Sequence, residues 1–115
     1  MPSVDETIAL DVLLIMKLLA KREYEAVSRI AGNARWTAVE IAAAVEAYGG
    51  TLTTPPDGDL TGVAAEVTED IFRRIHLTVP FWTTEEGESR LVLEMDITED
   101  RNGIWNDEIC EIYVR

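Results

Sequence analysis

Residues 72–98, FRRIHLTVPFWTTEEGESRLVLEMDIT, decide the class of fold. Apolar and polar residues alternate on both sides of an acidic turn that contains a glycine, which is the pattern of an antiparallel hairpin with one buried face. We therefore predict strands over residues 72–83 and 89–98. Pro80 has no N–H group to give to a strand ladder, so it predicts a sheet edge or a β-bulge. The residues expected to point inward are Ile75, Leu77, Val79, Phe81, Leu91, Leu93, Met95 and Ile97.

Two further strands extend this hairpin into an antiparallel meander. One is short, over residues 63–69, and the other runs over 104–114. Asn102-Gly103, just before the last strand, predicts a type I′ turn. Alternation in the last strand places Cys110, Ile112 and Val114 on one face and Ile109, Glu111 and Tyr113 on the other. We expect Cys110 to point inward as a small hydrophobic side chain.

The sequence before the meander predicts three helices. Ser3 with Glu6 forms a capping box for a helix that reaches about residue 20, and a short helix follows over 22–31. A third helix begins at Thr37 and ends at Gly49-Gly50. Residues 50–62 are rich in turn-forming residues and predict a loop without regular structure, long enough to act as a lid.

These elements predict a single α+β domain over residues 1–115. Its helical half spans residues 1–49, the loop spans 50–62, and the sheet half spans 63–115. Three helices would pack on one face of a curved antiparallel meander of about four strands.

Negative charge is concentrated in the sheet half. The net charge is −12; residues 1–50 hold seven acidic and five basic residues, whereas residues 51–115 hold fifteen and five. Such a field repels nucleic acids and anionic membranes and attracts basic partners, although solubility is the simpler interpretation of the same charge. The single cysteine excludes an internal disulfide, and no apolar run reaches the roughly 20 residues of a membrane span. We expect a cytoplasmic protein that binds neither nucleic acid nor membranes.

Two stretches carry a resemblance to known families. The order of helices, with REYEA at residues 22–26 and Tyr48-Gly49 closing the third helix, resembles the cystatin-like cone of the nuclear-transport-factor-2-like superfamily. WTTEEGES at residues 82–89, followed by LVLE at 91–94 and a closing ICEIYV at 109–114, resembles an uncharacterised family of small bacterial domains with a W-T-x-E-E-G-x-S hairpin. The resemblance implies a cone-shaped fold and a bacterial origin, and it carries over no catalytic residue.

His76 is the chain's only histidine and the centre of one candidate site. If the strands are adjacent in order, it shares a face with acidic and tyrosine side chains that suit general acid–base work in an apolar pocket. This alternative predicts a small-molecule-binding or isomerase-like domain with a pocket between the first helix and the sheet. A solvated polar face is the simpler interpretation of the same residues. The pocket candidates are His76, Glu94, Asp96, Glu111 and Tyr113.

The leading hypothesis is a non-enzymatic acidic module that binds a basic protein, as an immunity or antitoxin-like protein does. Tryptophans near acidic turns resemble an interface composition, and the interaction candidates are Trp82, Glu85, Glu86, Glu88 and Trp105. Each tryptophan could instead cap one end of the core, and Trp36 fits a hydrophobic staple against Ile41. A homodimer is the third possibility. We expect no cofactor and no metal, because the acidic turns lack calcium-loop spacing and Cys110 has no partner cysteine.

Overall fold

The computed structural model describes residues 4–31, 36–58, 60, 62–69 and 73–115. Three helices come first: α1 (Val4–Ala20), α2 (Tyr24–Ala31) and α3 (Ala38–Tyr48). They are followed by β1 (Leu52–Thr53), the 3-10 turn η1 (Pro56–Gly58), β2 (Ala64–Glu69), β3 (Arg73–Thr83), β4 (Gly87–Glu99) and β5 (Trp105–Val114). The expected α+β order, helices before an antiparallel meander, is confirmed.

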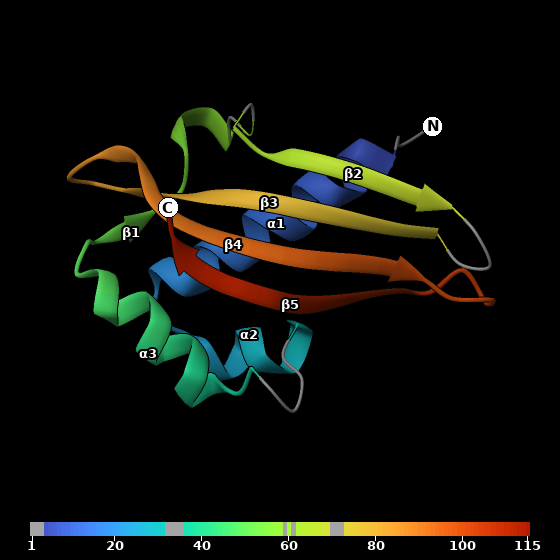
Figure 1. Ribbon diagram of the computed structural model, residues 1–115, viewed down its shortest axis with the longest axis horizontal. Helices are drawn as coiled ribbons and strands as arrows, with labels where there is room; N and C mark the ends of the chain where they lie inside the picture. The colour runs from blue at the N-terminus through green and yellow to red at the C-terminus, as the bar shows by residue number, and fades with distance from the viewer. Residues whose placement is uncertain (1–3, 32–35, 59, 61, 70–72) are drawn as a thin grey trace.

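The helices lie on one side of the sheet. Figure 1 shows α1 running behind the strands, with α2 and α3 below β5. The strand order is β1-β3-β4-β5, with β2 paired to β3 beside β1. All eight side chains expected to point inward are buried, against α1 residues Val12, Ile15, Met16 and Leu19. We call this the inner face, and the face turned away from α1 the outer face.

Helix α3 shows how local sequence sets an element's limits. Thr37 lies in extended backbone, and its Oγ1 accepts a hydrogen bond from the Glu40 amide at 3.4 Å, as an N-cap does. Gly49 ends the helix in the left-handed region, at φ +86°. Both expected signals are confirmed. The expected Ser3–Glu6 capping box lies outside the described side chains.

Pro80 sits at a break in the pairing of β3. The register of β3 with β4 shifts between Pro80 and Trp82, so the expected bulge is present. On the other side of β3, pairing with β2 ends at Thr78 and pairing with β1 begins at Trp82. Proline therefore occupies a position at which neither β1 nor β2 pairs with β3.

The prediction of a loop without regular structure over residues 50–62 is wrong, because this segment contains β1. Leu52 and Thr53 pair with Thr83 and Trp82, and the Thr84 amide donates to the Thr51 carbonyl at 3.0 Å. The physical reason is the length of β3. Strand β3 extends past the end of β2. Strand β1 pairs with this extension and satisfies backbone groups that would otherwise have no partner in the sheet.

The turn before β5 is also different from the prediction. Gly103 has φ +76°, but Asn102 has no positive φ, so the turn is not type I′. The Gly103 amide donates to the Asp100 carbonyl at 3.1 Å, which makes a type I turn followed by a left-handed glycine. The Asp100 carboxylate selects this form, because its Oδ1 accepts from the Asn102 amide at 2.8 Å and the Ile104 amide at 3.0 Å.

A bulge in β5 overturns the expected direction of Cys110. Glu94 pairs with Glu111 but Met95 pairs with Ile109, so Cys110 is the extra residue. Ile109 and Ile112 are both buried on the inner face, whereas Cys110 is only partly buried and turns toward the outer face. The period-two prediction fails here because the extra residue reverses the phase of the strand.

Arg22 closes α1 in a conformation that favours glycine. The Glu23 amide donates to the Leu18 carbonyl at 2.9 Å and the Arg22 amide to the Leu19 carbonyl at 3.0 Å, which is a Schellman motif with Arg22, at φ +60°, in the left-handed position. Arg22→Gly should therefore raise the free energy of unfolding by about 1 kcal/mol, since a side chain at positive φ is strained. Urea denaturation measures the change.

The matched control for this prediction is the preceding residue. Lys21 has no positive φ, so Lys21→Gly only adds backbone freedom to the unfolded chain and should lower stability. Equal destabilisation by both glycines would contradict the proposed strain at Arg22.

Candidate functional site: the acidic outer face of the sheet

Five carboxylates of the outer face lie in two neighbouring rows, and Arg74 lies in the row beyond them, opposite Thr68 and Thr98. Side chains paired across antiparallel strands point to the same side of the sheet, about 5 Å apart. One row runs across β2, β3, β4 and β5 through Glu66, His76, Asp96 and Glu108. The next row runs through Ala64, Thr78, Glu94 and Glu111. We define the acidic patch as the five carboxylates of these rows: Glu66, Glu94, Asp96, Glu108 and Glu111.

His76 is held between two of these carboxylates. Its Nδ1 lies 2.7 Å from Asp96 Oδ1, and its Nε2 lies 2.9 Å from Glu94 Oε1. The three side chains are 24–35% exposed. The hydrogen bond to Glu94, then that to Asp96, raises the pKa of His76, while partial burial opposes them. The imidazolium form is thus favoured, and it offsets one of the negative charges of the patch.

Cys110 joins this cluster through the β5 bulge. Its sulfur faces the acidic patch, where burial, followed by the nearby Asp96 carboxylate, raises the pKa of the thiol to about 11. Its carbonyl accepts a hydrogen bond from Trp36 Nε1 at 3.1 Å. The helical half of the chain therefore anchors the bulge that presents the thiol.

The five pocket candidates all belong to the outer face. His76, Glu94, Asp96 and Glu111 occupy the two charged rows, and Tyr113 pairs with Val92 one row further on. They face away from α1, whereas the inner face packs against α1 through buried side chains. The expectation that these residues line a pocket between the first helix and the sheet is therefore wrong. The strand adjacency that brought His76 to Glu94 and Asp96 is confirmed.

The acidic hairpin between β3 and β4 holds the fold together at one end. Thr51 donates to Glu85 through both its amide and its hydroxyl, each at 2.9 Å. Tyr48 donates its hydroxyl to Glu86 at 2.6 Å. The hydrogen bonds from the Thr51 amide and then its hydroxyl lower the pKa of Glu85. Glu86 thus fastens the turn to the end of α3, and Glu85 fastens it to the segment that follows the helix.

The two candidate tryptophans are not brought together. Trp82 and Trp105 are partly buried and pack against the core. They pair with Glu88 and Glu99, which lie at opposite ends of β4, about 35 Å apart at a rise of ~3.3 Å per residue. They cannot form one binding surface with the hairpin, and the alternative in which each covers one end of the core fits their packing.

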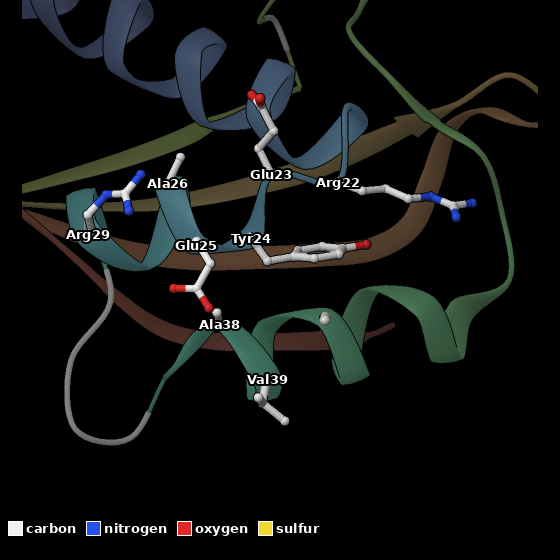
Figure 2. Close-up of a pocket in the computed structure, with 9 residues that line it drawn as sticks. Arg22, Glu23, Tyr24, Glu25, Ala26, Arg29, Ala38 and Val39 are labelled. Atoms are coloured by element: carbon white, nitrogen blue, oxygen red, sulfur yellow. The ribbon is translucent and has the colours of Figure 1, made fainter.

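A groove separates α2 from α3 on the helical side. It encloses about 430 Å³, and Figure 2 shows the ring of Tyr24 lying between the two helices, with Arg22 and Arg29 extending from opposite ends. Between these ends the lining includes the short side chains of Ala26 and Ala38 and also Glu25, whose carboxylate points toward Ala38. One carboxylate is fewer polar groups than the convergent set that small-molecule sites present. The outer face remains the stronger candidate.

One pair of carboxylates was not predicted from the sequence. Asp107 of β5 pairs with Ile97 and so lies on the inner face, close to Asp11 of α1. Its Oδ1 is buried without a hydrogen-bond partner. Burial, followed by the charge of Asp11 and a hydrogen bond to it, raises the pKa of Asp107 to about 7. The available signal was Asp11, a charged residue within the apolar run of the first helix.

Comparison with known proteins places the chain in a family. Residues 16–115 match the model of a domain of unknown function, DUF7668, and the chain belongs to that family. The match includes every strand and thus the whole acidic patch. No curated protein and no solved structure matches the chain. Within the described residues, none of the helices combines the length and the apolar character that crossing a membrane requires.

Proposed function

We propose that the protein is a non-enzymatic interaction module whose acidic patch binds a basic protein surface. The observation that carries this proposal is the clustering of five carboxylates from β2, β4 and β5 in two neighbouring rows, with His76 of β3 as the one cation within these rows. Such a surface attracts a cationic partner and speeds its approach. An immunity or antitoxin-like role, in which the partner is a cationic toxin, is the form of this function that we favour.

The shape of the patch supports a macromolecular partner. The two rows span four strands of one sheet, and Glu66 and Glu108 at their ends are exposed. A broad face of this kind suits a protein surface better than a small molecule, which needs a concave site. Two copies of the patch would repel each other, so the homodimer considered above would need a different surface.

The element order supports a relation to cystatin-like cone domains, which we propose together with a bacterial origin and a cytoplasmic location. Three helices before an antiparallel meander is the arrangement that the resemblance implies. Fold alone does not select a function, so the interaction proposal rests on the acidic patch.

Charge reversal on the patch tests the proposed function. A partner captured from a native lysate would be identified and purified, and its affinity measured by calorimetry at low and high salt. Glu66→Lys with Glu108→Lys should weaken binding by about tenfold or more, because each reversal replaces attraction with repulsion. The affinity of the unchanged protein should fall as salt rises.

A second double variant controls for net charge. Glu25→Lys with Glu40→Lys makes the same charge change at exposed positions on α2 and α3. We expect this variant to bind within about threefold of the unchanged protein. The proposal fails if the two double variants lose affinity equally, or if the outer-face variant keeps full affinity.

A further inference from the structure

We propose that His76, Asp96 and Cys110 form a zinc-binding site on the outer face. Nδ1 or Nε2 of the histidine, a carboxylate oxygen and the sulfur all lie within 4.8 Å of one another. They come from three adjacent strands, with His76 directly opposite Asp96 and Cys110 brought alongside by the β5 bulge. This inference goes beyond the proposed function and does not depend on it.

The ligand types select the metal. Nitrogen, carboxylate oxygen and sulfur together suit zinc, whereas calcium and magnesium prefer oxygen alone. Zinc bonds of 2.0–2.3 Å in a tetrahedron place ligand atoms about 3.3–3.8 Å apart. The present Nδ1-to-Oδ1 distance of 2.7 Å must open slightly, and the sulfur must close from at most 4.8 Å. Both movements are on the order of 1 Å, a distance that rotation about side-chain bonds can cover.

Glu94 supplies the outer contact that zinc ligands need. It lies 2.9 Å from His76 Nε2, on the far side of the ring from Asp96. A carboxylate in this place fixes the proton on Nε2 and leaves the Nδ1 lone pair for a metal. We therefore assign Glu94 as a positioning residue and not as a ligand.

The bulge is fixed in place as well. Trp36 Nε1 donates to the Cys110 carbonyl at 3.1 Å, which holds the residue whose sulfur would bind. The remaining carboxylates of the acidic patch raise the local concentration of cations. Three protein ligands leave the fourth position of a tetrahedron to water.

Binding replaces the proton of the Cys110 thiol and any proton on Nδ1 of His76 with the metal ion, because metal ligands must be deprotonated. Metal titration and affinity for a protein partner are separate measurements, so the two proposals can be tested separately.

Metal titration of the full chain tests the site. The protein would be freed of metal by a chelator and titrated with Co²⁺, whose bond to a thiolate gives a charge-transfer absorption band. Cys110 is the only cysteine in the chain, so the band reports this residue alone. We expect the band to appear at one Co²⁺ per chain and to disappear when Zn²⁺ is added. Absence of the band, or one metal for two chains, would overturn the proposal.

Substitutions identify the ligands. Cys110→Ser should abolish the band, and Cys110→Ser and Asp96→Asn should each weaken Zn²⁺ binding about 100-fold, with far-UV circular dichroism confirming that both variants fold. Glu94→Gln should weaken binding about tenfold but keep the band, as expected for a residue that orients His76. Glu66→Gln, a neighbouring patch carboxylate outside the set, should change affinity less than twofold. Zn²⁺ binding that is unaffected by Cys110→Ser would contradict the site.

Discussion

Replacing Trp36 with alanine should lower the free energy of unfolding by about 4 kcal/mol. The side chain is 9% exposed and belongs to the core, and truncating a buried tryptophan typically costs about 3–5 kcal/mol. The substitution also removes the hydrogen bond from Nε1 to the Cys110 carbonyl. Urea denaturation followed by circular dichroism measures the loss, since a domain of this size is expected to unfold in one step.

Trp36→Phe separates the packing from the hydrogen bond. Phenylalanine keeps most of the ring contact but cannot donate, so we expect a smaller loss of about 1–2 kcal/mol. Val39→Ala, which removes an exposed side chain on the neighbouring α3, should change stability by less than about 0.5 kcal/mol. If Trp36→Phe proved as stable as the unchanged protein, the bond to Cys110 would not be what anchors the bulge.

The sequence predicted well those parts of the fold in which neighbours in the chain determine the structure. Alternation along β3 and β4 identified all eight inward residues, because successive side chains of a strand point to opposite faces of the sheet. Thr37 and Gly49 marked the limits of α3, because the hydrogen bonds of a cap are made within a few residues.

The errors arose where distant parts of the chain meet. Strand β1 forms only because β3 outruns β2, and no local pattern reports the relative lengths of two strands. The bulge at Cys110 places both Ile109 and Ile112 in the core. Packing against the rest of the fold thus interrupts the two-residue alternation of the strand. Asp100 changed the type of the last turn through its side chain, although Asn102-Gly103 alone favoured another.

The candidate site shows the same division. His76, Glu94 and Asp96 could be grouped from sequence because adjacent strands of a meander fix which residues face each other. Cys110 was not assigned to this cluster, because the bulge that reverses the phase of β5 could not be predicted. Asp11 and Asp107 were not paired, since nothing in the sequence tells which strand a helix residue will contact.

Asp107→Asn should stabilise the protein at alkaline pH, by about 1–2 kcal/mol at pH 8. Burial, followed by the charge of Asp11, raises the pKa of Asp107 to about 7 in the folded state, against roughly 3.9 for an unfolded aspartate. The folded state thus binds more protons between these values, so stability falls as pH rises through that window. Three pKa units correspond to about 4 kcal/mol, and we reduce this because Asp107 is only partly buried and solvent screens its charge.

The pH dependence distinguishes this effect from a general relief of negative charge. Asparagine carries no ionisable proton, so the advantage of Asp107→Asn in urea denaturation should be largest at pH 8 and should shrink by at least half at pH 5. Glu66→Gln removes one charge from an exposed position and should change stability by less than about 0.5 kcal/mol at both pH values. An equal gain from Asp107→Asn at pH 5 and pH 8 would mean that ionisation beside Asp11 is not the cause. If it instead lowered stability at pH 8, then the ionised carboxylate contributes contacts that outweigh its repulsion by Asp11, and the pair strengthens the link between α1 and β5 rather than opposing it.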